Sequence, residues 1–266
     1  MYLAMINMDF KNHESVSNDI KNQIEWVRKI WSNHLGDDLI GMYIHGSMAL
    51  TCFREGVSDI DILIICKYQI PGTLRIAIAK DIIEADMNPC SLEISAICIA
   101  DLQPWKYPTL CQFHYSDYWT ERYRKFINGI THECFILDNN FEDKDIACHV
   151  KLTKQCGIRV YGKSIDDVFP DVPDEDFWDS ISCDIDDYDF KAYEPKYFAS
   201  NIIILGRILS YKKRKRILSK YEGGLWTLDY VPKQYRYIIE NAIHAWYGKE
   251  EIQEYNHEDL VGLKDF

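Results

Sequence analysis

The sequence lacks the patterns that would place it among zinc-binding, disulfide-rich or membrane proteins. None of its nine cysteines forms a CxxC pair, and several lie in apolar runs such as DILIIC (61–66). This usage is typical of buried free thiols in a reducing compartment. No apolar run reaches the roughly 18 residues that span a bilayer, and no cationic segment precedes a long apolar one near the N-terminus. We therefore expect a cytoplasmic protein without a signal peptide or membrane anchor.

Basic residues are fewer than acidic ones. The chain has 30 Lys and Arg against 42 Asp and Glu, a formal net charge of −12. Proteins that hold nucleic acids by their phosphates need a basic surface, so we expect no nucleic-acid partner. An acidic surface favours cationic partners or simply solubility. With 266 residues, 47% of them hydrophobic, the chain can form one large domain or two modest ones.

The first part of the chain combines helical and strand patterns. The predicted helices cover residues 17–35 and 73–86, and the predicted strands cover 39–47, 59–66 and 91–100. Gly36 follows the first helix as a stop signal. Strands that lie this close in sequence, with helices between them, predict a mixed sheet flanked by helices.

The pattern changes after about residue 145. A helix ending near Gly157 or Gly162 is followed by an acidic stretch over 166–189. Two long segments of helical periodicity come next, and no strand-type alternation is evident after residue 160. We therefore predict an α+β protein with an N-terminal domain over residues 1–158 and an all-helical C-terminal domain over 159–266.

A Gly-Ser pair and two aspartates carry the first chemical signal. Gly46 and Ser47 end one apolar run, and Asp59 and Asp61 open the next. Alternate residues of a strand point to the same side, so the two carboxylates project together. Like charges held side by side need a cation, and magnesium prefers oxygen ligands. Such a pair can bridge one or two Mg²⁺ ions that also hold nucleotide phosphates, which is the arrangement for nucleotidyl transfer.

The Gly-Ser turn and a third acid extend this site. Glycine lets the backbone approach a triphosphate closely, and the Ser47 hydroxyl can donate to its oxygens. Glu93 is a lone acid in an apolar strand, where an unpaired carboxylate is costly to bury. It is therefore our candidate for a third metal ligand and for the general base. The alternatives are a tight turn with solvated aspartates and a strand-edge glutamate facing water.

These residues resemble the front motif of the polymerase β-like nucleotidyltransferase superfamily. Later segments are similar, in the same order, to the spectinomycin and streptomycin adenylyltransferase family of aminoglycoside-modifying enzymes. Those segments are LQPWKYP (102–108), DKDIACHVKLTKQCGIRVYG (143–162), NIIILGRILSY (201–211) and LSKYEGGLWTLDYVPKQY (218–235). The resemblance covers about residues 39–250. It implies that the chain, acting as a monomer, transfers AMP from Mg-ATP to a drug hydroxyl in a cleft closed by the helical domain.

The resemblance also implies residue roles. Gly46 and Ser47 would contact the triphosphate, Asp59 and Asp61 would hold two Mg²⁺ ions with Glu93, and Glu93 would be the catalytic base. Arg207 and Lys220 match the phosphate-contacting cations of the helical domain. The alternative for both cations is a solvated position on a helix surface.

The residues expected to contact a cationic aminoglycoside or aminocyclitol match the family less well. Tyr118, with Trp119 beside it, stands nearest to a tryptophan that stacks on streptomycin in the family. Asp187, Asp189 and Glu194 are the candidate acidic ligands of the acceptor. These departures favour spectinomycin over streptomycin. The alternatives are another small-molecule or protein hydroxyl as acceptor, or a non-catalytic nucleotide-binding homologue.

Two histidines are expected to have no metal role. His45, before Gly46, is expected to pack at the strand end, with a place near the phosphates as the alternative. His149 lies in a predicted helix and has no second His or Cys at ligand spacing.

Overall fold

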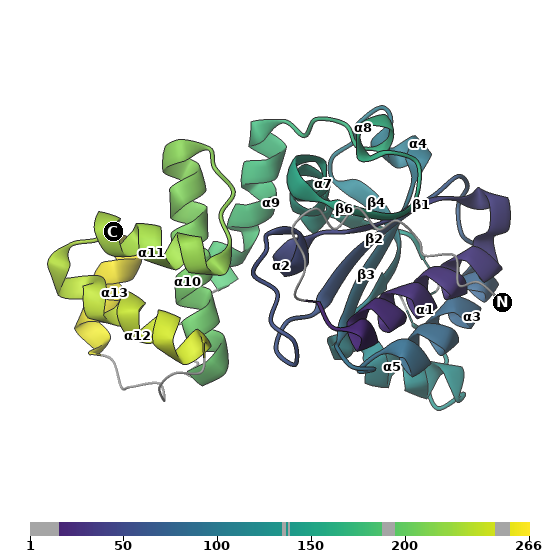
Figure 1. Ribbon diagram of the computed structural model, residues 1–266, viewed down its shortest axis with the longest axis horizontal. Coiled ribbons are helices and arrows are strands. Elements are labelled where there is room, and N and C mark those ends of the chain that lie inside the picture. The colour runs from purple at the N-terminus through teal and green to yellow at the C-terminus, as the bar shows by residue number, and fades with distance from the viewer. Residues whose placement is uncertain (1–15, 135–136, 138, 188–194, 248–255) are drawn as a thin grey trace. The chain divides into compact units, whose positions relative to one another are not determined.

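The structure is a computed structural model that divides into two compact units, Met1–Ser180 and Ile181–Phe266. The residues it describes are 16–134, 137, 139–187, 195–247 and 256–266. A six-stranded mixed sheet with flanking helices forms the first unit, and the described part of the second is helical (Figure 1). The predicted α+β class is therefore confirmed.

The sheet has the strand order β5-β4-β3-β2-β1-β6. Its strands are β1 (Leu39–Ile44), β2 (Ile60–Cys66), β3 (Leu92–Cys98), β4 (Thr109–Tyr115), β5 (Phe141–Asp143) and β6 (Ile158–Gly162). β2 and β3 are parallel, and the other neighbouring strands are antiparallel. The crossover between the two parallel strands is made by helix α3 (Gly72–Ala85), as a parallel pair requires.

Helices cover both faces of this sheet. The helical elements that begin in the first unit are α1 (Asn18–Leu35), η1 (Gly36–Asp38), α2 (Gly46–Ala49), α3 (Gly72–Ala85), α4 (Ile99–Leu102), α5 (Asp117–Ile127), α7 (Asp145–Cys156), α8 (Ile165–Val168) and α9 (Asp174–Asp187). Helices α1, α3 and α5 lie together on one side, with α7 across the sheet from them (Figure 1). Ile60, Ile62 and Ile64 of β2 share one core with Ile24 and Trp31 of α1. Because strand residues alternate, Asp61 faces the other way, toward the side of α7.

The predicted domain boundary after residue 158 is wrong. β6 begins at that residue and pairs antiparallel with β1, with Ile158 opposite Ile44. β6 runs two residues past position 160, and no described residue after Gly162 lies in a strand, in line with the absence of strand-type alternation there. β6 buries only two inward side chains, Ile158 and Val160, too few to distinguish the strand from the end of the preceding helix. The first unit therefore continues through Ser180.

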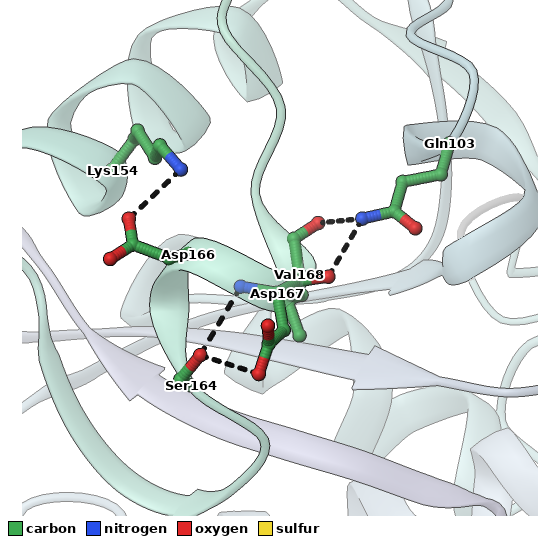
Figure 2. A network of polar contacts seen from close by, with 6 residues as sticks. All are labelled: Gln103, Lys154, Ser164, Asp166, Asp167 and Val168. Atoms are coloured by element: carbon green, nitrogen blue, oxygen red, sulfur yellow. Dashed lines mark hydrogen bonds and ion pairs between the residues drawn. The ribbon is translucent and has the colours of Figure 1, made fainter.

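The acidic stretch begins as part of this unit. Figure 2 shows Gln103 donating from Nε2 to the backbone carbonyls of Asp167 and the residue after it, at 3.0 and 2.9 Å. Lys154 pairs with Asp166 at 3.0 Å, and the Ser164 hydroxyl caps α8 by accepting from the Asp167 N–H. The first acids of the stretch therefore stabilise the chain after β6.

The second unit is built on close helix packing. Its helical elements are α10 (Pro195–Arg214), α11 (Lys220–Tyr230), η2 (Lys233–Tyr235), α12 (Arg236–Trp246) and α13 (His257–Asp265). A core that includes Ile203 and Ile239 joins α10 to α12. A Cβ added at Gly206 of α10 would lie 2.2 Å from Thr227 Oγ1 of α11, so a glycine is needed where these helices approach. No described helix is long and apolar enough to cross a membrane.

Candidate active site

The Gly-Ser turn lies directly against one of the paired aspartates. β1 ends as the backbone N–H of His45 donates to the Asp61 carbonyl at 3.0 Å. Gly46 then takes a left-handed conformation with φ of 58°, and a Cβ added there would lie 1.8 Å from Asp61 Oδ2. Only glycine avoids both the backbone strain and this clash. The turn is therefore built around the Asp61 carboxylate.

The parallel strands β2 and β3 set two carboxylates on one side of the sheet, and Asp59 lies just before β2. Asp61 and Glu93 are Cα partners in the register, so their side chains project from the same face. Asp59 lies two residues before Asp61, and its charge acts on Glu93. Asp59 is exposed, whereas the other two are partly buried. The structure thus places the three predicted carboxylates on neighbouring strand ends.

Glu93 is the most unusual of the three carboxylates. It forms no hydrogen bond or ion pair with any residue that the structure describes. Burial raises the pKa of Glu93, the charge of Asp59 acts in the same direction, and His149 opposes them. In such surroundings the ionised carboxylate is unfavourable unless a cation or a ligand compensates its charge, and otherwise the group keeps its proton.

The Ser47 hydroxyl is a second polar group of this site without a partner in the described part of the chain. Its Oγ is buried and has no hydrogen-bond partner among the described residues. Buried polar atoms are nearly always satisfied, and this hydroxyl, next to Gly46, is available to a partner bound from outside. A phosphate oxygen is such a partner.

We expect Ser47→Ala to weaken ATP binding about tenfold or more, since a hydrogen bond to a charged group contributes about 1.5–3 kcal/mol. Thermal stability should not fall, because the hydroxyl has no described protein partner. Calorimetric titration with ATP and thermal unfolding measure the two effects. Ser164→Ala, which removes the cap of α8, is the control that should lower stability and leave ATP affinity unchanged. Lower stability with normal ATP affinity in Ser47→Ala would contradict the prediction.

The carboxylates fit magnesium that arrives with a nucleotide. Among the described residues, no three His, Cys, Asp or Glu side chains are close enough to form a ready-made cation site. Mg²⁺ commonly takes one or two protein carboxylates together with substrate phosphates, instead of a protein cage. Asp59 and Asp61 provide such a pair. A metal site made by all three acids alone is not present in this structure.

Two histidines lie closer to the site than expected. His45 and His149 have ring centroids 4.6 Å apart, and the charge of His149 acts on Glu93. Burial, and in addition the charge of His149, lowers the pKa of His45. Its expected packing role is consistent with these surroundings. No sequence spacing indicated this contact, because the residues are far apart along the chain.

The candidate acceptor residues are only partly described. Tyr118 and Trp119 lie in the first turn of α5, where Tyr118 is 66% exposed and Trp119 packs partly against the core. Asp187 ends α9, and nothing is described of its side chain. Asp189 and Glu194 lie outside the described residues.

The two candidate phosphate contacts of the second unit are held within that unit. Arg207 donates from Nε to the Leu218 carbonyl at 2.7 Å. Lys220 donates to the Ser200 hydroxyl at 3.2 Å and lies 4.0 Å from the centroid of the Trp246 ring. Arg207 is therefore positioned by the segment between α10 and α11, and Lys220 by side chains of α10 and α12. Their role toward phosphate stays a prediction.

The similarity to known proteins extends over both units of the chain. Residues 167–265 match the family model described as aminoglycoside adenylyltransferase, C-terminal domain. An aminoglycoside (3'')(9) adenylyltransferase from Escherichia coli is 22% identical over 248 residues, which cover 90% of this chain and 89% of the relative. A spectinomycin 9-adenylyltransferase from Campylobacter jejuni is 22% identical over 238 residues, 87% of each chain.

The fold is shared with a solved enzyme. The crystal structure of a spectinomycin adenyltransferase from Enterococcus faecalis, with ATP and spectinomycin, matches with a TM-score of 0.76 at 22% identity. The match covers 92% of this chain and 98% of that one. The carboxylates beside the Gly-Ser turn and these relatives define the chain as a nucleotidyltransferase enzyme. Within that class, its residues 167–265 match the aminoglycoside adenylyltransferase C-terminal domain, and the chain as a whole is similar to aminoglycoside and spectinomycin adenylyltransferases.

Proposed function

We propose that the chain is an aminoglycoside or aminocyclitol O-adenylyltransferase that uses Mg-ATP and takes spectinomycin in preference to streptomycin. The observation that carries this proposal is Glu93, a partly buried carboxylate in register with Asp61 beside the Gly-Ser turn that forms no hydrogen bond or ion pair among the described residues. The relatives named as aminoglycoside and spectinomycin adenylyltransferases support the choice of acceptor.

Each residue of the site has a separate task in the proposed reaction. Glu93 takes the proton from the acceptor hydroxyl, whose oxygen then bonds to the α-phosphorus of ATP. The bond from that phosphorus to the β-phosphate oxygen breaks, and pyrophosphate leaves. Gly46 and Ser47 orient the triphosphate. Magnesium held by Asp59 and Asp61 would supply charge neutralisation at the phosphates.

The helical unit supplies the remaining phosphate contacts in this proposal. Arg207 and Lys220 would bind the triphosphate, since cations stabilise the charge that develops on the transferred group. The acids Asp187, Asp189 and Glu194 would attract the cationic acceptor. These assignments rest on the family resemblance.

The proposal predicts pyrophosphate release from Mg-ATP that depends on the acceptor. With spectinomycin, streptomycin, kanamycin and lincomycin offered in turn, we expect turnover with spectinomycin and much slower turnover with streptomycin. Removing Mg²⁺ with EDTA should abolish the release, and restoring it should recover the release. Mass spectrometry of the drug should show the addition of AMP. ATP binding without turnover of any of the four drugs would contradict the proposed acceptor class and point to another hydroxyl.

A further inference from the structure

Helix α7 lies over the part of the sheet that carries the candidate site. It contacts both α2, which begins with the Gly-Ser pair, and β4, and β3 lies beside β4 in the sheet. Leu92 and Ile94 of β3 belong to the core on the α1 side, so Glu93 between them points toward α7. A side chain of α7 that faces the sheet therefore lies near a ligand held between Glu93 and the Gly-Ser turn.

His149 is the α7 residue whose contact with the Gly-Ser turn is best defined. Its ring centroid lies 4.6 Å from that of His45, and the two ring planes are tilted by 30°. His45 directly precedes Gly46, and its backbone N–H donates to the Asp61 carbonyl at 3.0 Å. The charge of His149 acts on Glu93 as well. The imidazole thus lies beside the turn, on the side of the sheet where Glu93 projects.

The hydrogen-bonding capacity of this ring is not used by the described part of the protein. The Nδ1 atom of His149 is buried and has no hydrogen-bond partner among the described residues. An unsatisfied buried nitrogen is costly, and packing against His45 alone requires only an aromatic ring. The Oγ of Ser47 is in the same state, one residue beyond Gly46. Both atoms are therefore available to one ligand bound at the turn.

We propose that His149 is a further catalytic residue, which donates a hydrogen bond from Nδ1–H to a non-bridging oxygen of the α-phosphate of ATP. This inference rests on the proposed function, in which the α-phosphate lies between the acceptor hydroxyl at Glu93 and the rest of the triphosphate at the Gly-Ser turn. A neutral imidazole carries one N–H and can donate it without a change of charge. Donors aimed at a transferred group stabilise the transition state more than the bound substrate. The contact therefore acts mainly on kcat.

The test compares two replacements of His149 in the full chain, with Mg-ATP and spectinomycin as substrates. His149→Phe keeps a ring against His45 but removes the donor, so kcat should fall about 10²- to 10³-fold, with little change in the KM for ATP. His149→Asn places an amide nitrogen where Nδ1 lies and should recover about tenfold of this loss, the contribution of one hydrogen bond. The melting temperature of His149→Phe should not fall, because Nδ1 has no described partner to lose. His132→Phe makes the same change at an exposed position and should behave as the unsubstituted chain.

Two kinetic results would overturn the proposal. A normal kcat in His149→Phe would show that an aromatic ring is sufficient at this position. Equal rates in folded His149→Phe and His149→Asn would show that a donor at the Nδ1 position has no effect. If the phenylalanine variant unfolds, His149→Gln takes its place in the comparison with His149→Asn, because its longer side chain cannot place an amide where Nδ1 lies.

A spectroscopic measurement separates this inference from the proposed function. Mg-ATP alone, without an acceptor, should shift the imidazole nitrogen NMR signals of His149, which are assigned by their absence from His149→Phe. The signals of the exposed His132 should not move. Signals of His149 that stay in place at saturating Mg-ATP would overturn its contact with the phosphate. If they shift and no drug is adenylylated, the proposed acceptor is wrong and the role of His149 toward ATP is supported.

Discussion

Replacing Glu93 with glutamine is expected to lower pyrophosphate release from Mg-ATP with spectinomycin by about 10²- to 10⁴-fold, the contribution of a general base. Glutamine keeps the shape of the side chain and removes its ability to accept the acceptor's proton. ATP should still bind, because the Gly-Ser turn and the paired aspartates are unchanged. Single-turnover kinetics and an ATP titration measure the two quantities separately.

The same variant should be no less stable than the unsubstituted chain. Glu93 has no hydrogen bond or ion pair in the described part of the structure to lose. Since burial raises its pKa in the folded state, the folded protein binds this proton more tightly than the unfolded one. The contribution of Glu93 to stability therefore decreases as pH rises through its raised pKa. Metal-free Glu93→Gln should melt at the same or a higher temperature at neutral pH.

An exposed glutamate provides the matched control. Glu121 lies on α5 with its side chain 71% exposed, so Glu121→Gln makes the same chemical change away from the carboxylates. Its turnover and melting temperature should match those of the unsubstituted chain. If Glu93→Gln kept more than about a tenth of the normal rate, a loss below that of any typical general base, another group would have to accept the proton.

The paired aspartates and the third acid could be predicted because they depend on local rules. The alternation of strand side chains predicted that Asp59 and Asp61 project together. Glu93 could be identified because it is a single acid in an otherwise apolar strand. The register of β2 and β3 brings Glu93 directly opposite Asp61.

Contacts between distant parts of the chain could not be predicted in this way. β6 joins the sheet only by pairing with β1, more than a hundred residues earlier, and its short apolar pattern gave no separate signal. The predicted boundary after residue 158 failed there. The contact between the rings of His149 and His45 likewise depends on how α7 packs against the sheet. Periodicity identifies elements and their faces, but not which distant element covers each face.

Gly46→Ala is expected to reduce turnover about 100-fold or more, although it adds only a methyl group. The backbone must keep a φ of 58°, which costs a residue with a Cβ roughly 1–2 kcal/mol. The new Cβ would also lie 1.8 Å from Asp61 Oδ2, so the carboxylate or the turn must move. A displacement of about 1 Å in a catalytic group can cost about 10²-fold in rate.

A second glycine distinguishes this clash from backbone strain alone. Gly129 follows α5 with a φ of 70°, and a Cβ added there meets nothing within 4 Å. Gly129→Ala should therefore lose a similar amount of stability to strain and keep its turnover and magnesium dependence. Gly46→Ala should also need more Mg²⁺ for half-maximal rate, because Asp61 is the group displaced. If both variants had the same rate and magnesium dependence, the contact between Gly46 and Asp61 would have no part in catalysis.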